Sequence, residues 1–323
     1  MLYLAKIVFA ALVGAVLFGA PLASAQDKVR VAVFPSLSAL PFFVARDRGF
    51  LKEVGIEAEG INFQTHPLIL QALIAGDIDA ASNFVTLEGA NGFALKPGVV
   101  RFVSVNAQNV KYRGEVFVVR TGFSAGSIKD LTGAKIMSAP GPANMSAARA
   151  VLKANGLVEG KDFTFSEQQM GMHLPALKAG TFDAAYTLEP LASMMVNEGV
   201  ARILEDGVIA KYIVGRPEGF VAAAGGALSG KFLTERPDVA KRFVAAWRKA
   251  IDTIWKDPSV RDYLSKYMNT PAVVAPTVPF VKFTMSSDLS DADMADMQKF
   301  IDFAVDSGVV RSKVDVKQLL LTM

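Results

Sequence analysis

Residues 73–81 read Leu-Ile-Ala-Gly-Asp-Ile-Asp-Ala-Ala, and residues 177–185 repeat this stretch as Leu-Lys-Ala-Gly-Thr-Phe-Asp-Ala-Ala. A second pair of similar stretches, residues 51–56 and 152–157, precedes the two copies in the same order and at nearly the same separation. A period of roughly 100 residues is too long for a solenoid repeat. The duplication therefore predicts two similar α/β lobes in one chain, with a ligand in the cleft between them.

The composition supports a two-lobed globular protein. The chain has 323 residues, 51% of them hydrophobic, which is enough to bury about two domain cores. It contains no cysteine, so its stability depends on these cores, and no lipid can be attached to a cysteine. The formal net charge is +3 and the basic residues are dispersed, so we expect no nucleic-acid partner.

The first 25 residues have the pattern of a secretory signal peptide. Lys6 precedes an apolar run over residues 7–20, and Ala23-Ser24-Ala25 matches a small-residue cleavage site. The alternative is a membrane anchor, but the run is shorter than the roughly 20 residues that span a bilayer. We therefore expect cleavage after Ala25 and a periplasmic product.

Strand and helix patterns alternate in both halves of the chain. The predicted strands are residues 29–34, 56–63 and 78–81 in the first half, and 135–138, 163–165 and 182–186 in the second. The predicted helices are residues 40–53 and 67–75, then 144–154 and 174–179. This order is typical of parallel sheets. The repeated glycines, Gly76 and Gly180, are expected to end their helices with a positive φ.

Two extended segments, residues 115–120 and 220–224, flank the second lobe. They predict that the chain crosses between the lobes twice. The first lobe is then residues 26–118 and 219–323, and the second lobe is residues 119–218. We expect the lobes to close by a hinge motion at these segments, near Arg120 and Phe220.

Ordered motifs along the chain resemble one family. They are Pro-Phe-Phe-Val-Ala at residues 41–45, Gly-Phe-Leu at 49–51, Gly-Ile at 55–56, Ala-Leu-Ile-Ala-Gly-Asp-Ile-Asp at 72–79, Asp-Leu-Thr-Gly-Ala-Lys-Ile at 130–136, Pro-Gly at 140–141 and Glu-Pro at 189–190. The set resembles periplasmic solute-binding proteins of ABC importers, in the aliphatic sulfonate, nitrate, taurine and thiamine-pyrimidine-precursor branch. The resemblance implies an α/β, type II periplasmic-binding-protein fold, with two lobes, two crossing segments and a ligand cleft.

Candidate ligand-binding residues follow from where strands end. Ligands of open α/β sheets lie outside the carboxyl ends of the strands, where helix N-termini offer free N–H groups. The loops at these ends supply Ser36, Ser38, Gln64, Thr65, His66, Ser82, Asn83, Phe84, Asn144, Ser146, Met170, Tyr186, Thr187 and Glu189. Asn83 and Thr187 occupy equivalent places in the repeat, so we expect them to meet across the cleft.

Several of these residues have a structural alternative. Ser36, Asn144 and Ser146 are also suited to capping helices, and Phe84 to the core. Glu189 is suited to stabilising a helix N-terminus or to pairing with a cationic or N–H-bearing ligand, which would oppose a sulfonate. His66 and His173 are equally consistent with ordinary loop histidines, and only His66 is retained as a ligand residue.

The function expected from this pattern is non-catalytic solute capture. The chain has no cysteine nucleophile and no His-Glu-x-x-His motif, so we expect no enzyme activity, no cofactor and no metal site. The expected partners are a small organic solute and an ABC permease in the inner membrane, and the protein is expected to be a monomer. A ligand-sensing periplasmic protein and a pyrimidine-precursor-related enzyme of the same fold are the alternatives. Sulfonate, nitrate, an aromatic acid and a pyrimidine all remain open as ligands.

Overall fold

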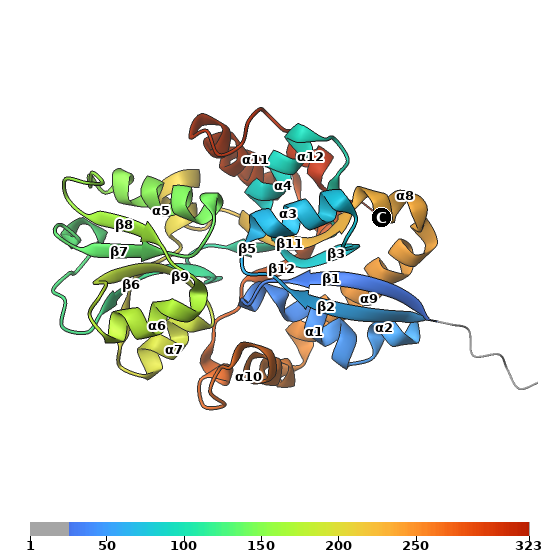
Figure 1. The fold of residues 1–323 in the computed structure, drawn as a ribbon, viewed down its shortest axis with the longest axis horizontal. Helices are drawn as coiled ribbons and strands as arrows, with labels where there is room; N and C mark the ends of the chain where they lie inside the picture. Colours follow the sequence, from blue (N-terminus) through green and yellow to red (C-terminus); the bar gives the residue numbers. More distant parts are fainter. Residues whose placement is uncertain (1–25, 323) are drawn as a thin grey trace, which may run out of the picture.

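The computed structural model describes residues 26–322, and the predicted signal peptide lies outside them. Two α/β lobes lie side by side, each built on its own sheet (Figure 1). The first lobe contains both ends of the described chain. The second lobe is formed by the middle of the chain, shown in green and yellow-green.

The first sheet combines strands from both ends of the chain. Its order is β12 (Lys282–Met285), β5 (Ser104–Gln108), β11 (Val221–Ser229), β3 (Ala80–Val85), β1 (Asp27–Val33) and β2 (Ile56–Asn62), and β4 (Val100–Phe102) also pairs with β11. The second sheet has the order β10 (Ala201–Asp206), β6 (Glu115–Arg120), β9 (Ala184–Leu188), β7 (Lys135–Ser138) and β8 (Thr164–Glu167).

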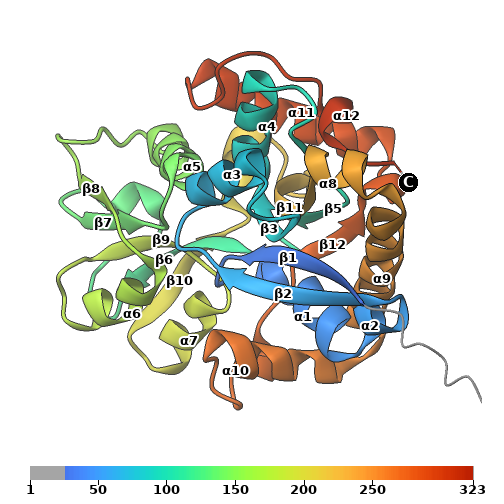
Figure 2. The same ribbon diagram turned by 45° about the vertical axis from the view of Figure 1, so that its right-hand side comes forward.

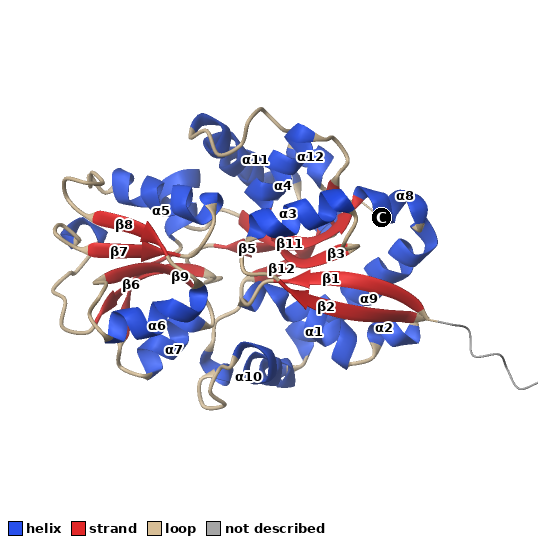
Figure 3. Ribbon diagram, viewed as in Figure 1, coloured by secondary structure: helices blue, strands red, loops and turns tan. Residues whose placement is uncertain are grey.

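Helices cover both faces of each sheet (Figure 3). In the first lobe, one face carries α3 (His66–Ala75), α4 (Thr86–Leu95), α11 (Asp291–Asp306) and α12 (Val316–Leu319), and the other carries α1 (Leu40–Asp47), α2 (Phe50–Glu53) and α9 (Pro237–Lys256). The remaining helices of this lobe are α8 (Gly230–Glu235) and α10 (Asp262–Met268). In the second lobe, α5 (Pro142–Ala154) lies opposite α6 (Met170–Lys178) and α7 (Leu191–Asn197).

The sheets are mixed, whereas the sequence pattern predicted parallel sheets. The repeated units are parallel, because β1 pairs with β2 and β3, and β7 pairs with β8 and β9, in that sense. The strands next to the crossings break this arrangement. Both β11 and β6 run antiparallel to their neighbours, because the chain enters each sheet from the other lobe.

The repeated aspartate performs the same task in both lobes. The Asp79 carboxylate accepts a hydrogen bond from the backbone N–H of Arg30 in β1 at 2.8 Å. The Asp183 carboxylate accepts one from the backbone N–H of Lys135 in β7 at 2.9 Å. The duplicated sequence therefore fixes the third strand of each unit against the first.

The repeated glycines end their helices as predicted, with φ of 79° at Gly76 and 71° at Gly180. The predicted helix over residues 40–53 is wrong in one respect, since it is two helices, α1 and α2. The break falls at Gly49, whose φ of 79° cannot continue an α-helix.

Two crossing segments, residues 109–114 and 207–220, connect the lobes side by side. The Val110 N–H donates to the Pro217 carbonyl at 3.2 Å, and the Asn109 amide donates to the Glu218 carbonyl at 3.1 Å. Gly207 has φ of 61°, and a Cβ there would lie 2.7 Å from the Val110 nitrogen, so this approach requires glycine.

The hinge position predicted near Arg120 is wrong, whereas Phe220 does end a crossing segment. Arg120 lies at the far end of β6 from the crossing, where its guanidinium bonds Asp183 at 2.9 Å. The Phe220 N–H donates to the buried Asp296 carboxylate of α11 at 2.9 Å, and Arg216 pairs with the same carboxylate. The second crossing segment is thus anchored on the first lobe.

The core is nearly continuous between the lobes. One apolar cluster contains Phe34 and Phe84 of the first lobe together with Phe117 and Tyr186 of the second. The short π-helix Ala210–Val214 packs on α5 of one lobe and α11 of the other. Figure 2 shows α5 of the second lobe on the same side of the molecule as α3 and α4 of the first.

Candidate functional site

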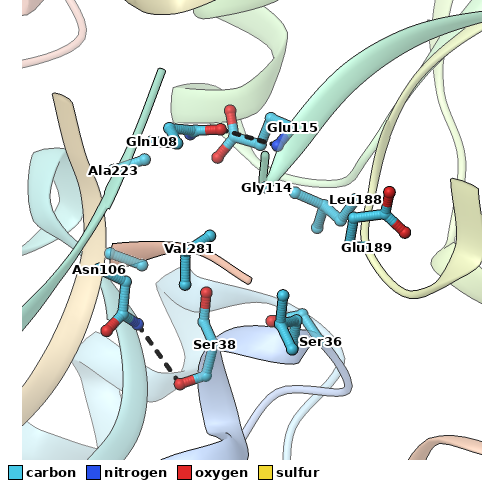
Figure 4. Close-up of a pocket in the computed structure, with 12 residues that line it drawn as sticks. Ser36, Ser38, Asn106, Gln108, Gly114, Glu115, Leu188, Glu189, Ala223 and Val281 are labelled. Carbon is cyan, nitrogen blue, oxygen red and sulfur yellow. Dashed lines mark hydrogen bonds between the residues drawn. The ribbon is translucent and has the colours of Figure 1, made fainter. Parts of the chain in front are cut away.

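A small polar cavity lies where the two lobes meet (Figure 4). Part of its wall comes from β5, β6 and β11, which adjoin the crossing segments and are called the crossing strands below. Its free space is about 20 Å³, room for about one water molecule. The lining consists of Ser36, Leu37, Ser38, Asn106, Gln108, Gly114, Glu115, Leu188, Glu189, Ala223, Ala224 and Val281. Three of the predicted ligand residues are among them: Ser36, Ser38 and Glu189.

The first-lobe wall of the cavity is held in place by Asn83. The Asn83 amide donates to the Phe34 carbonyl at 3.0 Å and to the Ser36 hydroxyl at 2.9 Å, and it accepts from the Phe34 N–H at 3.1 Å. The Ser82 hydroxyl also donates to the Asn83 side-chain oxygen, at 2.8 Å. Asn83 and Ser82 are therefore engaged behind the loop after β1, and they do not line the cavity.

The second-lobe wall is formed around Glu189, whose side chain is fully buried. Its carboxylate accepts from the Arg113 guanidinium at 3.0 Å and from the Ser193 N–H of α7 at 3.1 Å. Burial raises the pKa of this carboxyl, and Arg113 opposes the rise. The Ser193 contact is the helix N-terminal role that the sequence left open.

One backbone hydrogen bond joins the two walls directly. The Leu37 N–H donates to the Glu189 carbonyl at 3.0 Å, and the Glu189 N–H donates to the Gly114 carbonyl at 2.9 Å. The structure is therefore a closed arrangement, in which main chain from the first lobe, the second lobe and a crossing segment is linked at Glu189.

A second buried acid, Glu115, begins β6 at the back of the cavity. The Tyr186 hydroxyl donates to its carboxylate, and the Glu115 N–H donates to the Gln108 side-chain oxygen at 2.7 Å. Burial raises the pKa of Glu115, against the effect of the hydrogen bonds from Tyr186 and Gln108. Tyr186, predicted to contact the ligand, instead lies in the core and positions this carboxyl group.

Asn106 lines the cavity from β5 and has an unused acceptor. Its side-chain amide donates to the Ser38 carbonyl at 3.3 Å, and the residue is only 2% exposed. The Asn106 Oδ1 atom is buried and accepts from no group within residues 26–322. Because Ser38 presents a carbonyl acceptor, the amide nitrogen must face it, and the oxygen is the free end.

Two further predicted residues, Thr187 and His66, are buried away from the cavity. The Thr187 hydroxyl bonds the His173 Nδ1 atom at 3.0 Å, so it is paired within its own lobe and forms no hydrogen bond to Asn83. His66 begins α3, with its ring 4.5 Å from that of Phe34, and burial lowers its pKa to about 3. Its Nδ1 atom has no hydrogen-bond partner in the part of the chain that the structure describes.

The other predicted residues lie around the same junction without lining the cavity. Phe84 is fully buried and stacks on Phe102, so it is core. Asn144 donates to the Pro140 carbonyl at 2.7 Å at the start of α5, and the Ser146 hydroxyl is 3.4 Å from that of Ser307 in the first lobe. Met170 is buried at the start of α6, Gln64 is exposed, and Thr65 is the N-cap of α3.

Sequence reasoning missed the cavity residues contributed by the crossing strands, by the crossing segment 109–114 and by the residue before β12. These are Asn106, Gln108, Gly114, Glu115, Ala223, Ala224 and Val281. One signal was present, because Ser104, Asn106 and Gln108 place polar side chains at every second position of a buried strand. Glu115, a charged residue opening the apolar run of β6, was another.

Two other findings concern the described residues as a group. Among residues 26–322, no three His, Cys, Asp or Glu side chains gather in a metal-binding arrangement. Over the same range, no helix has the length and apolar sequence needed to cross a membrane.

Comparison with known proteins identifies the family and the fold. The model of the NMT1-like family matches residues 23–269. No curated protein matches the chain. Many solved structures do, at low sequence identity.

Three solved structures show the extent of the likeness. The periplasmic aliphatic sulphonate binding protein of Escherichia coli is 19% identical, with a TM-score of 0.69, over 91% of this chain and 97% of that one. The alkanesulfonate-binding protein of Xanthomonas axonopodis pv. citri, bound to MOPS, is 17% identical, with a TM-score of 0.72, over 93% and 99%. The periplasmic nitrate-binding protein of Synechocystis PCC 6803 is 13% identical, with a TM-score of 0.68, over 90% and 84%. The predicted type II periplasmic-binding-protein fold is confirmed.

Proposed function

The chain belongs to the NMT1-like family, and from this premise we propose that it is the solute-binding component of an ABC importer. It captures a small organic solute between its lobes and delivers it to a permease in the inner membrane. The observation that carries the proposal is the polar cavity at the junction of two lobes that are joined by only two crossing segments.

In this proposal the binding cycle is a hinge motion at residues 109–114 and 207–220. Pockets for organic ligands usually measure about 300–1,000 Å³, so a cavity of about 20 Å³ must widen to admit one. The Leu37–Glu189 hydrogen bond breaks as the lobes part. A solute that contacts both walls favours the closed population, which the permease recognises.

The contacts to the solute come from three sources. Ser36 and Ser38 approach from the first lobe, Glu189 from the second, and Asn106 and Glu115 from the crossing strands. Gln64 and Thr65 do not line the cavity of this closed arrangement. The signal-peptide pattern of the first 25 residues supports a periplasmic location.

Non-catalytic binding is the form of the proposal that the comparisons support. The three solved structures above are binding proteins for a sulfonate or nitrate. A turnover assay in which the purified chain releases a chemically altered product would overturn this part of the proposal.

The test is a thermal-shift panel on protein refolded to strip any bound solute. The panel contains alkanesulfonates, nitrate, aromatic acids, hydroxymethylpyrimidines and alkylamines. A solute at 100 times its dissociation constant stabilises the folded state by about 2.7 kcal/mol, which is a measurable shift. A selective, saturable shift that is accompanied by a smaller radius of gyration supports the proposal, and a flat response to the whole panel contradicts it.

A further inference from the structure

The lining of the cavity contains acidic and neutral polar side chains but no basic ones. None of its side chains is a lysine, arginine or histidine. Its polar side chains are two serine hydroxyls, two amides and two carboxyls. A sulfonate or nitrate accepts hydrogen bonds from N–H or O–H donors, but no cationic side chain of this lining balances its charge, and two of the six polar side chains are acidic.

The two carboxyl groups of the lining are in different electrostatic situations. Glu189 has a cationic partner in Arg113 and a backbone donor in Ser193. Glu115 forms no ion pair with any side chain of residues 26–322, and its side-chain hydrogen-bond partners, Tyr186 and Gln108, are neutral. A cation beside Glu115 would oppose the rise in pKa that burial causes and would favour the ionised carboxylate, whereas an oxyanion beside that carboxylate would be repelled.

The unused Asn106 acceptor points to the same chemistry. A buried oxygen without a donor is unfavourable because it has lost its hydrogen bonds to water, and a ligand N–H removes that cost. Asn106 Oδ1 is fixed as the free end by the Ser38 carbonyl, so an acceptor atom of a ligand has nothing to bind there. This orphaned acceptor is independent of the two carboxyl groups.

Size limits which donor group fits. The free space of about 20 Å³ holds a group about as large as a water molecule. A primary ammonium is compact and carries three donors on one point charge. Oxygen atoms of the lining, among them the Glu115 carboxylate and the hydroxyls of Ser36 and Ser38, can accept hydrogen bonds from these N–H groups.

We infer that this cavity takes the ammonium end of an organic cation, with the rest of the solute extending toward the opening between the lobes. The inference rests on the proposed function and names its solute class. It distinguishes this chain from the sulfonate- and nitrate-binding proteins that share its fold.

The test compares two probes of equal carbon length, n-butylammonium chloride and sodium butane-1-sulfonate, by titration calorimetry at constant ionic strength. Wild-type protein is expected to bind the ammonium and not the sulfonate. Glu115→Gln keeps the shape of the side chain and is expected to weaken ammonium binding by about tenfold or more. Asn106→Asp adds a negative charge at the free acceptor and is expected to strengthen it.

The matched control is Glu88→Gln. Glu88 is another buried glutamate of the first lobe, but it lies in α4 and does not line the cavity. Its replacement should leave the affinity for butylammonium unchanged. Thermal unfolding of each variant shows whether the protein is still folded.

The possible outcomes separate this inference from the proposed function. Saturable binding of butane-1-sulfonate or another anion without binding of butylammonium overturns the inference and leaves the solute-binding function standing. Butylammonium binding that is equal in wild-type and Glu115→Gln protein also overturns it, because the cation is then held elsewhere. Failure of both probes and of the whole thermal-shift panel overturns both proposals.

Discussion

The two lobes share the same repeated sequence, but the residues that follow it have different roles in each lobe. In the first lobe, Asn83 follows the repeat and fixes the loop after β1 through Phe34 and Ser36. In the second, Tyr186 follows it and reaches across to β6, where it holds Glu115. The shared aspartates, Asp79 and Asp183, anchor the strands identically. The comparison teaches that the duplicated residues build the lobes, while the residues just beyond them shape the cavity.

The strongest test of this comparison replaces the polar residue at the equivalent position of β3 and β9. Asn83→Leu leaves the Phe34 N–H and carbonyl unpaired in a buried loop, so we expect a loss of about 3 kcal/mol in unfolding free energy. Thr187→Val removes a single hydrogen bond to His173 and should cost about 1 kcal/mol. Urea denaturation measures both. Equal losses at the two positions would contradict the difference between the lobes.

The two buried histidines sharpen the comparison through pH. Burial lowers the pKa of His66 to about 3 and that of His173 to about 4, below the ordinary value of 6.5. The unfolded chain therefore binds more protons than the folded one between these values, and stability is lost as the pH falls below 6.5.

We expect His66→Phe to reduce the difference in unfolding free energy between pH 7 and pH 5 by about 2 kcal/mol. The ring lies against Phe34 and Phe84, so phenylalanine suits the site. His173→Phe should reduce the pH dependence similarly but also destabilise the protein at pH 7, because Thr187 loses its partner. Chemical denaturation at several pH values gives both quantities, and an unaltered slope in His66→Phe would be inconsistent with a neutral buried ring.

The smallest expected effect compares the repeated glycines. Both Gly76 and Gly180 have a positive φ, so alanine is strained at each and should cost about 1 kcal/mol. A Cβ at Gly76 would lie 3.0 Å from the flexible Lys231 side chain, which can move, and a Cβ at Gly180 meets nothing within 4 Å. Thermal unfolding should therefore show similar shifts for the two alanine variants. A much larger shift at Gly76 would mean that Lys231 is held rigidly.

Local sequence patterns predicted the parts of the fold that local chemistry controls. Helix-ending glycines such as Gly76, the β7 strand at residues 135–138 and the alternation of strands and helices are all set by neighbours in the chain. The mixed sheets were not predicted, because they depend on how β5, β11 and β12 join the first sheet and how β6 joins the second. Gly49 was overlooked as a break in residues 40–53 because the apolar spacing continues through it.

The candidate site was only partly predictable for the same reason. Ser36, Ser38 and Glu189 follow strands of the repeated units, so the strand-end rule located them. Asn106 and Glu115 lie on β5 and β6, Val281 directly precedes β12, and only the assembled topology brings these residues together. Asn83 was selected for its chemistry, but the hydrogen bonds it forms depend on the position of Phe34 in space.

The contact between Leu37 and Glu189 has a consequence for how a protein with the proposed function can diversify. It joins a backbone N–H to a backbone carbonyl, so a side-chain replacement at either position leaves both groups in place, proline at residue 37 excepted. The surrounding side chains can then be exchanged, by mutation or by an engineer, while the contact between the lobes is inherited unchanged. In the proposed function, solute recognition depends on side chains, whereas this contact between the lobes depends on the backbone. The chain is therefore a suitable scaffold for engineering a new solute specificity.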